Sequence, residues 1–278
     1  MSPTIAQALA QSGLVPIDAQ VLLAYVVGNT RAWLVAHADE LLTPNEAARF
    51  FSLTRRRRNG EPIAYLTGLR EFWALPLIVT QNVMIPRPET ETLIERALAR
   101  LPIDRASRVL DLGTGSGAIA LALARERPHA HIVATDISEA ALRVADANAR
   151  RLGLYNVEFV RADWYEGLDV LDANVFDMIV SNPPYIAAAD PHLGDGDLRF
   201  EPMAALTPGA NGLAALTTII AGAPQRLATN GSLVVEHGYD QQEDVRGLFE
   251  DAGFTELEST RDLAGIPRVC AGVIGVRR

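Results

Sequence analysis

The chain has 278 residues, of which 49% are hydrophobic and 21% are charged, as is typical of a soluble globular protein with one large domain or two smaller ones. Its net charge of -9 argues against a protein that binds mainly to nucleic-acid phosphates, because such binding needs an excess of Lys and Arg. The single Cys270 excludes an intramolecular disulfide and a cysteine-rich zinc site. The five His residues show no metal-ligand spacing, and we therefore expect no metal.

The first residues, "MSPTIAQALAQSGLVP", lack the basic start and the unbroken apolar core of a signal peptide. No run in the sequence approaches the roughly 18 apolar residues that a membrane-spanning helix needs. Together with the single cysteine, these features predict a protein of the reducing cytoplasm.

Residues 1–70 are expected to form a small helical domain. Its clearest helix is "TPNEAARFFSLTRRRRNG", in which Thr43 is the cap, Pro44 the first helical residue and Glu46 the partner in a capping box, while Gly60 ends the helix. Another helix, within "PIDAQVLLAYVVGN", is expected to end at Gly28.

Residues 71–86 are expected to form a β-hairpin that links two domains. The stretch "REFWALPLIVTQNVMIP" is rich in aromatic and β-branched residues, and Gln81-Asn82 is the expected turn. Pro76 restricts the first strand to an edge position, since proline cannot donate to a ladder.

Residues 87–278 are expected to form a doubly wound α/β sheet, because strands and helices alternate after a helix that can start at Pro88. The candidate strands are residues 107–113, 131–136, 157–163, 176–184, 231–238, 255–260 and 268–276.

The stretch "VLDLGTGSGAIALALA" predicts a strand, a glycine-rich turn and an amphipathic helix, in that order. Gly113, Gly115 and Gly117 allow a tight turn that brings a ligand against a helix amino terminus. With Ala118 the pattern also satisfies the dinucleotide fingerprint G-x-G-x-x-A, so a NAD-dependent dehydrogenase is one alternative.

Asp136 ends the next strand, where a carboxylate accepts hydrogen bonds from ribose hydroxyls of either NAD or S-adenosylmethionine. Two features favour S-adenosylmethionine. Asp111 precedes the first glycine by two residues, as in the D-x-G-x-G-x-G form of methyltransferases, and Asp163 and Trp164 follow the third strand, where they are placed to meet an adenine.

The fourth strand ends in "SNPPY", at the edge of the sheet where ligands bind in open α/β folds. An amide or exocyclic amine is a poor nucleophile, because its lone pair is delocalised. The side-chain carbonyl of Asn182 and the backbone carbonyl of Pro183 can orient such an NH2 and stabilise its developing positive charge, with Pro184 as a rigid support. Tyr185 offers a ring face to a planar acceptor.

These motifs resemble those of the bacterial peptide chain release factor glutamine methyltransferases, the PrmC/HemK family. The resemblance covers nearly the whole chain. It includes "GEPIAYLTGLREFW", "IPRPETE", "DLGTGSGAIALALA", "SNPPYI", "DPHLGDGDLRFEP" and "EHG" at Glu236 to Gly238. It implies a Rossmann-like class I methyltransferase domain with a seven-stranded sheet, behind a helical domain and a hairpin.

The resemblance further implies S-adenosyl-L-methionine as cofactor, S-adenosyl-L-homocysteine as product, and release factors, through their GGQ loop, as partners. Asn182, Pro183, Pro184 and Tyr185 would then hold the substrate glutamine and serve catalysis. The implied cofactor-binding residues are Asp111, Gly113, Thr114, Gly115, Ser116, Gly117, Asp136, Ile137, Asp163, Trp164 and Asn182.

Other acceptors and other classes of protein have to be weighed. A glutamine methyltransferase for a ribosomal protein would share every catalytic residue. A DNA adenine methyltransferase also uses N-P-P-Y and would flip its base, but the net charge and the absence of a basic recognition domain disfavour it. A dehydrogenase has no need of the N-P-P-Y residues. For a noncatalytic cofactor-binding module, replacing Asn182 would leave methyl transfer unaffected.

Two further segments have expected roles. The helical domain at residues 1–70 is hypothesised to dock the release factor outside the GGQ loop, and Arg55 to Arg58 could contact an acidic partner or simply form a solvated face. The long segment from Ile186 to about Gly212 carries few regular signals, so we expect a functional loop that borders the acceptor channel and orders around the substrate.

Overall fold

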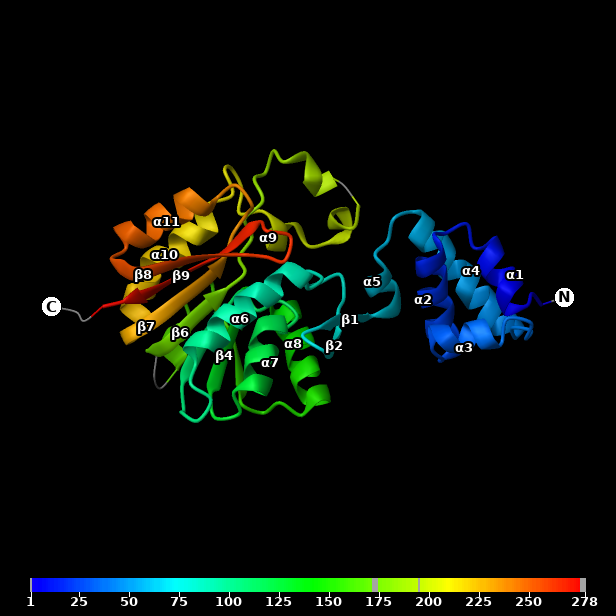
Figure 1. Ribbon diagram of the computed structural model, residues 1–278, viewed down its shortest axis with the longest axis horizontal. Helices are drawn as coiled ribbons and strands as arrows, with labels where there is room; N and C mark the ends of the chain where they lie inside the picture. Colours follow the sequence, from blue (N-terminus) through cyan, green and yellow to red (C-terminus); the bar gives the residue numbers. More distant parts are fainter. Residues whose placement is uncertain (1, 172–174, 195, 276–278) are drawn as a thin grey trace. The chain divides into compact units, whose positions relative to one another are not determined.

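The computed structural model describes residues 2–171, 175–194 and 196–275, and the chain divides into two compact units (Figure 1). One unit comprises Met1–Leu69 together with Gly194–Phe200, and the other comprises Arg70–Leu193 and Glu201–Arg278. Over the described residues, no helix is both long enough and apolar enough to cross a membrane.

The first unit is a bundle of short helices: α1 (Ile5–Gln11), α2 (Pro16–Val27), α3 (Arg31–Ala36), α4 (Pro44–Arg58) and α5 (Ile63–Thr67). The predicted capping box is present in α4, since Thr43 accepts from the backbone N–H of Glu46 and the Glu46 carboxylate accepts from that of Thr43. Gly28 ends α2 in the left-handed conformation. The fully buried core of the bundle includes Leu22, Leu23 and Phe50.

Two arginines of the Arg55–Arg58 run are paired within this unit. Arg56 pairs with Glu61, while Arg57 donates to Asp18 at 2.7 Å and to Asp197, in the 194–200 segment, at 3.0 Å. These two side chains therefore stabilise the unit itself, which lowers the number of arginines that remain for an external partner.

The hairpin precedes the sheet, but its turn is not where the sequence predicted it. Strand β1 (Leu69–Phe72) pairs with β2 (Leu75–Ile78), so the turn is Trp73-Ala74 and the prediction of Gln81-Asn82 was wrong. Both turn residues have positive φ values, 50° and 52°, which side chains other than glycine rarely adopt. Distant groups hold them there: Glu91 accepts from the Trp73 N–H at 3.0 Å, and Arg125 donates to the Trp73 carbonyl at 2.6 Å.

Pro76 lies in β2, the second strand of the hairpin, rather than in the first as predicted. Since the small sheet has only two strands, each is an edge strand, and the missing N–H of a proline interrupts no further ladder.

The second unit is built on a seven-stranded sheet of order β5-β4-β3-β6-β7-β9-β8. Its strands are β3 (Arg108–Leu112), β4 (His131–Asp136), β5 (Val157–Arg161), β6 (Phe176–Ser181), β7 (Leu227–Glu236), β8 (Phe254–Arg261) and β9 (Pro267–Ile274). The five strands β3 to β7 run parallel, while β9 runs antiparallel to both of its neighbours. Each strand overlaps a predicted one, so the predicted α/β sheet is confirmed.

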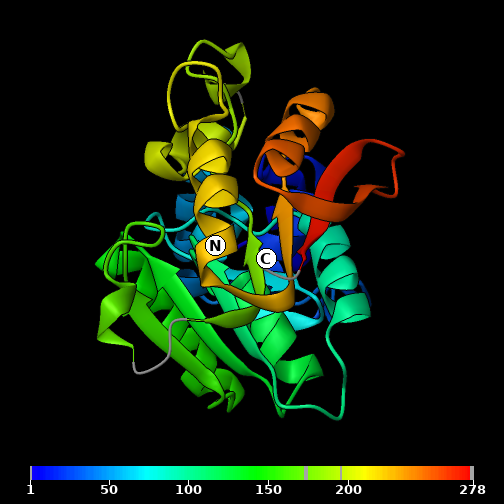
Figure 2. The same cartoon turned by 90° about the vertical axis from the view of Figure 1, so that its left-hand side faces the viewer.

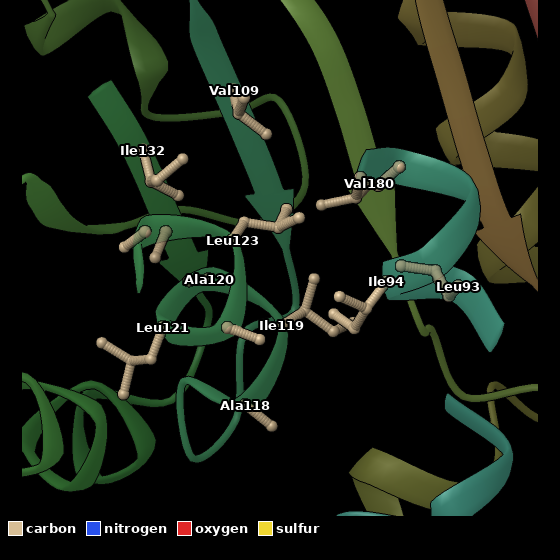
Figure 3. Close-up of a cluster of buried hydrophobic side chains, with 14 of the residues drawn as sticks. Leu93, Ile94, Val109, Ala118, Ile119, Ala120, Leu121, Leu123, Ile132 and Val180 are labelled. Carbon is tan, nitrogen blue, oxygen red and sulfur yellow. The ribbon is translucent and has the colours of Figure 1, made fainter. Parts of the chain in front are cut away.

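Helices cover both faces of this sheet (Figure 2). Successive residues of the buried strands point to opposite sides, so each face presents apolar side chains that helices cover. One face carries η1 (Pro88–Thr90), α6 (Glu91–Arg100), α7 (Ala118–Glu126) and α8 (Glu139–Leu152), and the other carries α10 (Ala214–Arg226) and α11 (Gln242–Asp251). In β3, for example, Val109 packs toward α7 and Leu110 toward α10. Figure 3 shows part of the first of these cores, where Leu123 of α7 points toward Val109 and Val180 while Ile119 of α7 lies beside Ile94 of α6.

Strand register brings particular residues together at the carboxyl edge of the sheet. Leu112 lies beside Thr135, and Ser181 lies beside Val235, so Asn182 follows β6 next to Glu236, the last residue of β7. Shorter elements complete the unit: η2 (Leu168–Val170), η3 (Pro191–Gly194) and α9 (Met203–Leu206), while η4 (Leu198–Phe200) belongs to the first unit.

Candidate active site

A cavity of about 250 Å³ opens at the carboxyl edge of the sheet, within the second unit. This is the place where open α/β folds bind ligands, since the loops between parallel strands and helices meet there. The glycine loop, the end of β4, the loop after β5 and the residues after β6 all contribute to its lining.

The glycine loop supplies Gly113, Thr114, Gly115 and Ser116 to the wall of the cavity. The backbone N–H of Thr114 donates to the Thr135 carbonyl at 2.8 Å, which ties the loop to β4. Hydrogen bonding to the backbone therefore fixes the position of the loop.

Gly117 does not line the cavity but caps α7, with a φ of 84°. A Cβ at this position would lie 3.0 Å from Cδ1 of Leu121 and 3.2 Å from Cβ of Ala145. Glycine is required here because of both its backbone conformation and the close packing between α7 and α8. This residue, predicted to bind cofactor, shapes the loop that lines the cavity.

Asp111 also lies beneath the loop rather than in the cavity wall. Its side chain is completely buried and accepts from the Thr114 hydroxyl at 2.6 Å. Burial raises the pKa of Asp111 to about 7, although the hydrogen bonds from Thr114 and from the backbone of Ala120 oppose the shift. The carboxyl predicted to bind cofactor therefore holds the loop residue Thr114 in place.

Asp136 lines the cavity at the end of β4, with Ile137 beside it. The backbone N–H of Ser138 donates to its Oδ1 at 2.8 Å, and that of Gly115 to its Oδ2 at 3.0 Å. Burial raises the pKa of Asp136, while these backbone hydrogen bonds lower it. Each carboxylate oxygen has a second lone pair, so the group can still accept from two ligand hydroxyls.

Asp163 and Trp164 line the cavity from the loop after β5. The N–H of Asp163 donates to the Glu166 carbonyl at 3.0 Å, and that of Glu166 donates back at 2.9 Å, which closes a tight turn. Trp164 has a φ of 49° in this turn, an uncommon value for a large side chain. Its ring also lies within van der Waals distance of the position that a Cβ on Gly113 would take.

Two of the four predicted substrate residues, Asn182 and Pro184, line the cavity. Asn182 donates from Nδ2 to the Thr90 hydroxyl at 3.0 Å. Pro183 and Tyr185 lie outside the lining, and the Tyr185 hydroxyl donates to Oε1 of Glu236 at 2.9 Å. The "NPPY" residues thus alternate between the cavity and the structure behind it.

Two further residues of the site lie in the quoted motifs "IPRPETE" and "EHG", although the sequence analysis assigned them no role. Thr90 lines the cavity from the start of α6, and Glu236 lies behind it, 1% exposed, at the end of β7. Burial raises the pKa of Glu236 to about 7, against hydrogen bonds from Thr90 and Tyr185 and the positive charge of Arg268, which lower it. Burial lowers the pKa of the neighbouring His237.

Two segments far apart in the sequence form the remaining wall, one at residues 82–86 and one at residues 202–205. Glu201 joins them, since Oε2 accepts from the Ile85 N–H at 3.1 Å and Oε1 pairs with Arg87. The quoted motifs "IPRPETE" and "RFEP" contain these residues, so the motifs were visible in the sequence while their contact was not.

Asn148 of α8, completely buried, connects the hairpin to the glycine loop. Its Nδ2 donates to the carbonyls of Ile78 and Ser116, both at 2.9 Å, and its Oδ1 accepts from the Ile78 N–H. The side chain uses both of its donors and its acceptor oxygen to fix the two segments.

The fold and this edge-of-sheet cavity define a class I methyltransferase, and comparison with known proteins agrees. Residues 103–259 match a family model described as a methyltransferase domain, and residues 4–68 match one described as the PrmC N-terminal domain. A solved methyltransferase from Pyrococcus furiosus aligns with a TM-score of 0.56 at 15% identity, covering 81% of this chain and 99% of that one, which supports the fold.

Two curated relatives are similar over nearly their whole length. The release factor glutamine methyltransferase of Bordetella pertussis is 51% identical over 96% of this chain and 97% of its own. That of Salmonella typhimurium is 50% identical over 92% of this chain and 91% of its own. The chain therefore belongs to the release factor glutamine methyltransferase family, as its motifs predicted.

Proposed function

We propose that this protein transfers a methyl group from S-adenosyl-L-methionine to the side-chain amide nitrogen of the glutamine in the GGQ motif of peptide chain release factors. The observation that carries the proposal is the position of Asn182. Its amide lines the same cavity as Asp136, in a chain that belongs to the release factor glutamine methyltransferase family.

The residues of the cavity fit S-adenosylmethionine. The Asp136 carboxylate, held by two backbone N–H groups, is suited to the ribose hydroxyls, and Trp164 and Asp163 are suited to the face and the amino group of the adenine. Gly113 to Ser116 would hold the remainder of the cofactor along the loop. When bound, S-adenosylmethionine supplies an electrophilic methyl group on a positively charged sulfur.

The chemistry on the acceptor side falls to Asn182 and the prolines. A glutamine amide has no proton that must be removed before it attacks, but its nitrogen becomes positive as the methyl arrives. The Asn182 Nδ2 is engaged by Thr90, so Oδ1 is the atom that would accept from the substrate NH2 and stabilise that charge. We propose the Pro183 carbonyl as the second acceptor, with Pro184 lining the cavity beside it.

The role of Tyr185 differs from the one expected from the sequence. With its hydroxyl bound to Glu236 and its carbonyl accepting from Gln241 at 3.0 Å, the residue is anchored in the unit rather than presented to the cavity. We propose that it supports the loop that follows β6.

We propose the first unit as the docking domain for the release factor, in the cytoplasm where translation takes place. It corresponds to the matched PrmC N-terminal domain, and it exposes apolar side chains that its own core does not use, among them Val35 and Leu41 at 71% and 70%. Replacing both with serine is expected to raise KM for the intact factor and leave KM for a short GGQ peptide unchanged. If the double variant and the unmodified protein had equal KM values for the intact factor, this docking role would be contradicted.

The proposed reaction can be tested by mass spectrometry. The protein is incubated with S-adenosylmethionine and a purified release factor, with ribosomal protein and adenine-containing DNA as parallel acceptors. One added methyl on the GGQ glutamine is the expected result. Transfer only to ribosomal protein or DNA would retain the chemistry of the site and overturn the assigned partner.

A further inference from the structure

Successive residues of the glycine loop are tied to different elements of the fold. The backbone N–H of Thr114 donates to β4, and that of Gly115 donates to the Asp136 carboxylate. The backbone carbonyl of Ser116 accepts from Nδ2 of Asn148 at 2.9 Å. Asn148 belongs to α8, so a helix that does not adjoin the loop in the chain fixes the end of the loop.

Hydrogen bonds have to select the conformation of this loop. Gly115 and Gly117, on either side of Ser116, have φ values of 56° and 84°. Glycine reaches positive and negative φ about equally readily, so the chain itself does not hold the loop in one state. Within the loop, the Gly117 N–H donates to the Thr114 carbonyl at 2.9 Å. From outside the loop, the completely buried Asn148 holds the Ser116 carbonyl.

The same side chain also holds the end of the hairpin. Oδ1 of Asn148 accepts from the Ile78 N–H at 2.6 Å, and Nδ2 donates to the Ile78 carbonyl at 2.9 Å. Ile78 is the last residue of β2, and the chain that follows it supplies the segment at residues 82–86 to the cavity wall. One carboxamide therefore joins two walls of the cavity, the glycine loop and the 82–86 segment.

Holding the hairpin to α8 does not by itself require Asn148. Arg151, further along α8, donates to the Pro76 carbonyl at 2.7 Å from the exposed surface. A buried carboxamide is costly unless its polar atoms are paired, and its partners here are backbone groups of the hairpin and of the glycine loop. What Asn148 adds to the attachment of the hairpin is the hydrogen bond to Ser116, and it thereby couples the hairpin to the loop.

We infer that Asn148 is a positioning residue for the cofactor, which acts through the backbone of Ser116 and Ile78 to hold the glycine loop and the 82–86 segment in place around one ligand. A loop that adopts its binding conformation only part of the time loses affinity in proportion, so a fixed loop binds more tightly. The inference rests on the proposed function for its cofactor, S-adenosylmethionine, but it does not depend on the methyl acceptor.

The first test measures S-adenosylmethionine binding to Asn148→Asp by calorimetry, without any acceptor. The new side chain has nearly the same size and keeps an acceptor oxygen for the Ile78 N–H, but it has lost the NH2 that holds the Ser116 carbonyl. Because about one hydrogen bond then no longer holds the loop, the dissociation constant should rise about tenfold. At saturating cofactor, kcat should stay within about threefold, since the residues after β6 are unchanged.

The matched control is Asn156→Asp, which makes the same change directly before β5, away from the cavity. Nδ2 of Asn156 also donates to backbone carbonyls, among them those of Ala124 and Ala130. The melting temperature should fall in both variants, whereas the dissociation constant per folded molecule should stay within about twofold in Asn156→Asp. Equal weakening of cofactor binding in the two variants would overturn the inference, because loss of stability alone would then explain it.

A second readout follows the coupling itself. Ile78 does not line the cavity, yet S-adenosylmethionine should slow hydrogen exchange of its N–H, measured by NMR, in the unmodified protein and in Asn156→Asp. In Asn148→Asp this response should disappear, although the N–H keeps its acceptor. A response that persists in Asn148→Asp, or none in the unmodified protein, would overturn the inference.

Two further outcomes are covered by the same experiments. If Asn148→Asp does not fold, Asn148→Ser takes its place, because the shorter side chain cannot bridge Ile78 and Ser116. If the unmodified protein binds S-adenosylmethionine but methylates no release factor, the proposed function fails, while the binding constants and the exchange rates still decide the role of Asn148.

Discussion

The two halves of the cavity are built in different ways. On the side proposed for the cofactor, the Asp136 carboxylate is held by the backbone N–H groups of Ser138 and Gly115, and the loop it faces is a continuous run of residues. On the side proposed for the acceptor, Asn182 is held by the side chain of Thr90, which lies 92 positions away in the chain.

This difference has a physical reason. A ribose that is the same in every turnover can be bound by a carboxylate that backbone donors hold, since the positions of these donors follow from the local chain path. An acceptor amide requires one particular oxygen to point at it, and here a side-chain hydroxyl, that of Thr90, holds the Asn182 amide by accepting from Nδ2. Changes on the two sides should therefore have different kinetic effects.

The largest effect is expected from Asn182→Ala. Removing the acceptor oxygen should lower kcat by about 10²–10³-fold, by analogy with the loss of one oxyanion-hole donor, while the dissociation constant of S-adenosylmethionine stays nearly unchanged. Stopped assays for kcat and calorimetry for cofactor binding would measure the two quantities.

The matched control is Asn156→Ala. Its side chain donates to three backbone carbonyls, among them that of Ala124 at 3.1 Å, so this change should lower the melting temperature without changing kcat per folded molecule. A normal kcat in Asn182→Ala would remove the acceptor side from the proposed mechanism.

A second effect concerns pH, and it has opposite signs for activity and stability. Since burial raises the pKa of Glu236 to about 7, the carboxylate that accepts from the Tyr185 hydroxyl gains a proton below that pH. The hydrogen bond that anchors the residues after β6 then changes, so kcat should fall in acid. Glu236→Gln should show a lower kcat that no longer changes in this range. A wild-type profile without a step near neutral pH would contradict the role given to Glu236.

The free energy of unfolding should change with pH in the opposite direction to kcat. A carboxyl whose folded pKa lies above its unfolded value of 4.5 favours folding while it is protonated, and this advantage disappears as the pH rises through about 7. The fully developed difference is on the order of 3 kcal/mol. Burial raises the pKa of Asp111 in the same way. Denaturant titrations should therefore show a free energy of unfolding that falls from pH 5 to pH 8, and Glu236→Gln should reduce this fall without abolishing it.

On the cofactor side, Asp136→Asn should weaken binding of S-adenosylmethionine about 10- to 100-fold, since hydrogen bonds to a charged group are worth about 1.5–3 kcal/mol. At saturating cofactor, kcat should change much less than in Asn182→Ala. Asp146→Asn, on the exposed face of α8 where Asp146 pairs with Arg150, is the matched control and should leave both constants unchanged. If Asp136→Asn lowered kcat but left the affinity for S-adenosylmethionine unchanged, the proposed division of the cavity into a cofactor side and an acceptor side would be contradicted.

The smallest effect is expected from Tyr185→Phe, which removes one donor from Glu236 and should cost about 1 kcal/mol of stability. Because the carboxylate loses a partner, the pKa of Glu236 should rise further and the acid limb of kcat should move to higher pH. Tyr165→Phe loses a comparable bond, from its hydroxyl to the Ile219 carbonyl at 2.7 Å, and should leave the pH profile in place. Equal profiles for both variants would show that Tyr185 does not act on Glu236.

The cofactor side was predictable to a useful degree, because glycines and strand-end carboxylates are local signals. Asp111 and Gly117 belong to the same motif but lie beneath the cavity wall, and the sequence did not show that position. Of the "NPPY" residues, Asn182 and Pro184 line the cavity, while the anchoring of Tyr185 depends on Glu236, 51 residues away.

The amino-acid sequence by itself determined the alternation of strands and helices, the capped helix α4, the glycine loop and the family, since each depends on residues that are neighbours in the chain. Only the tertiary structure decided the hairpin turn at Trp73-Ala74, which Glu91 and Arg125 hold against its own backbone preference. It also decided the hydrogen bond between Asn182 and Thr90 and the one between Tyr185 and Glu236. Strand register and helix packing bring these groups within hydrogen-bonding distance, and no spacing along the chain encodes that meeting.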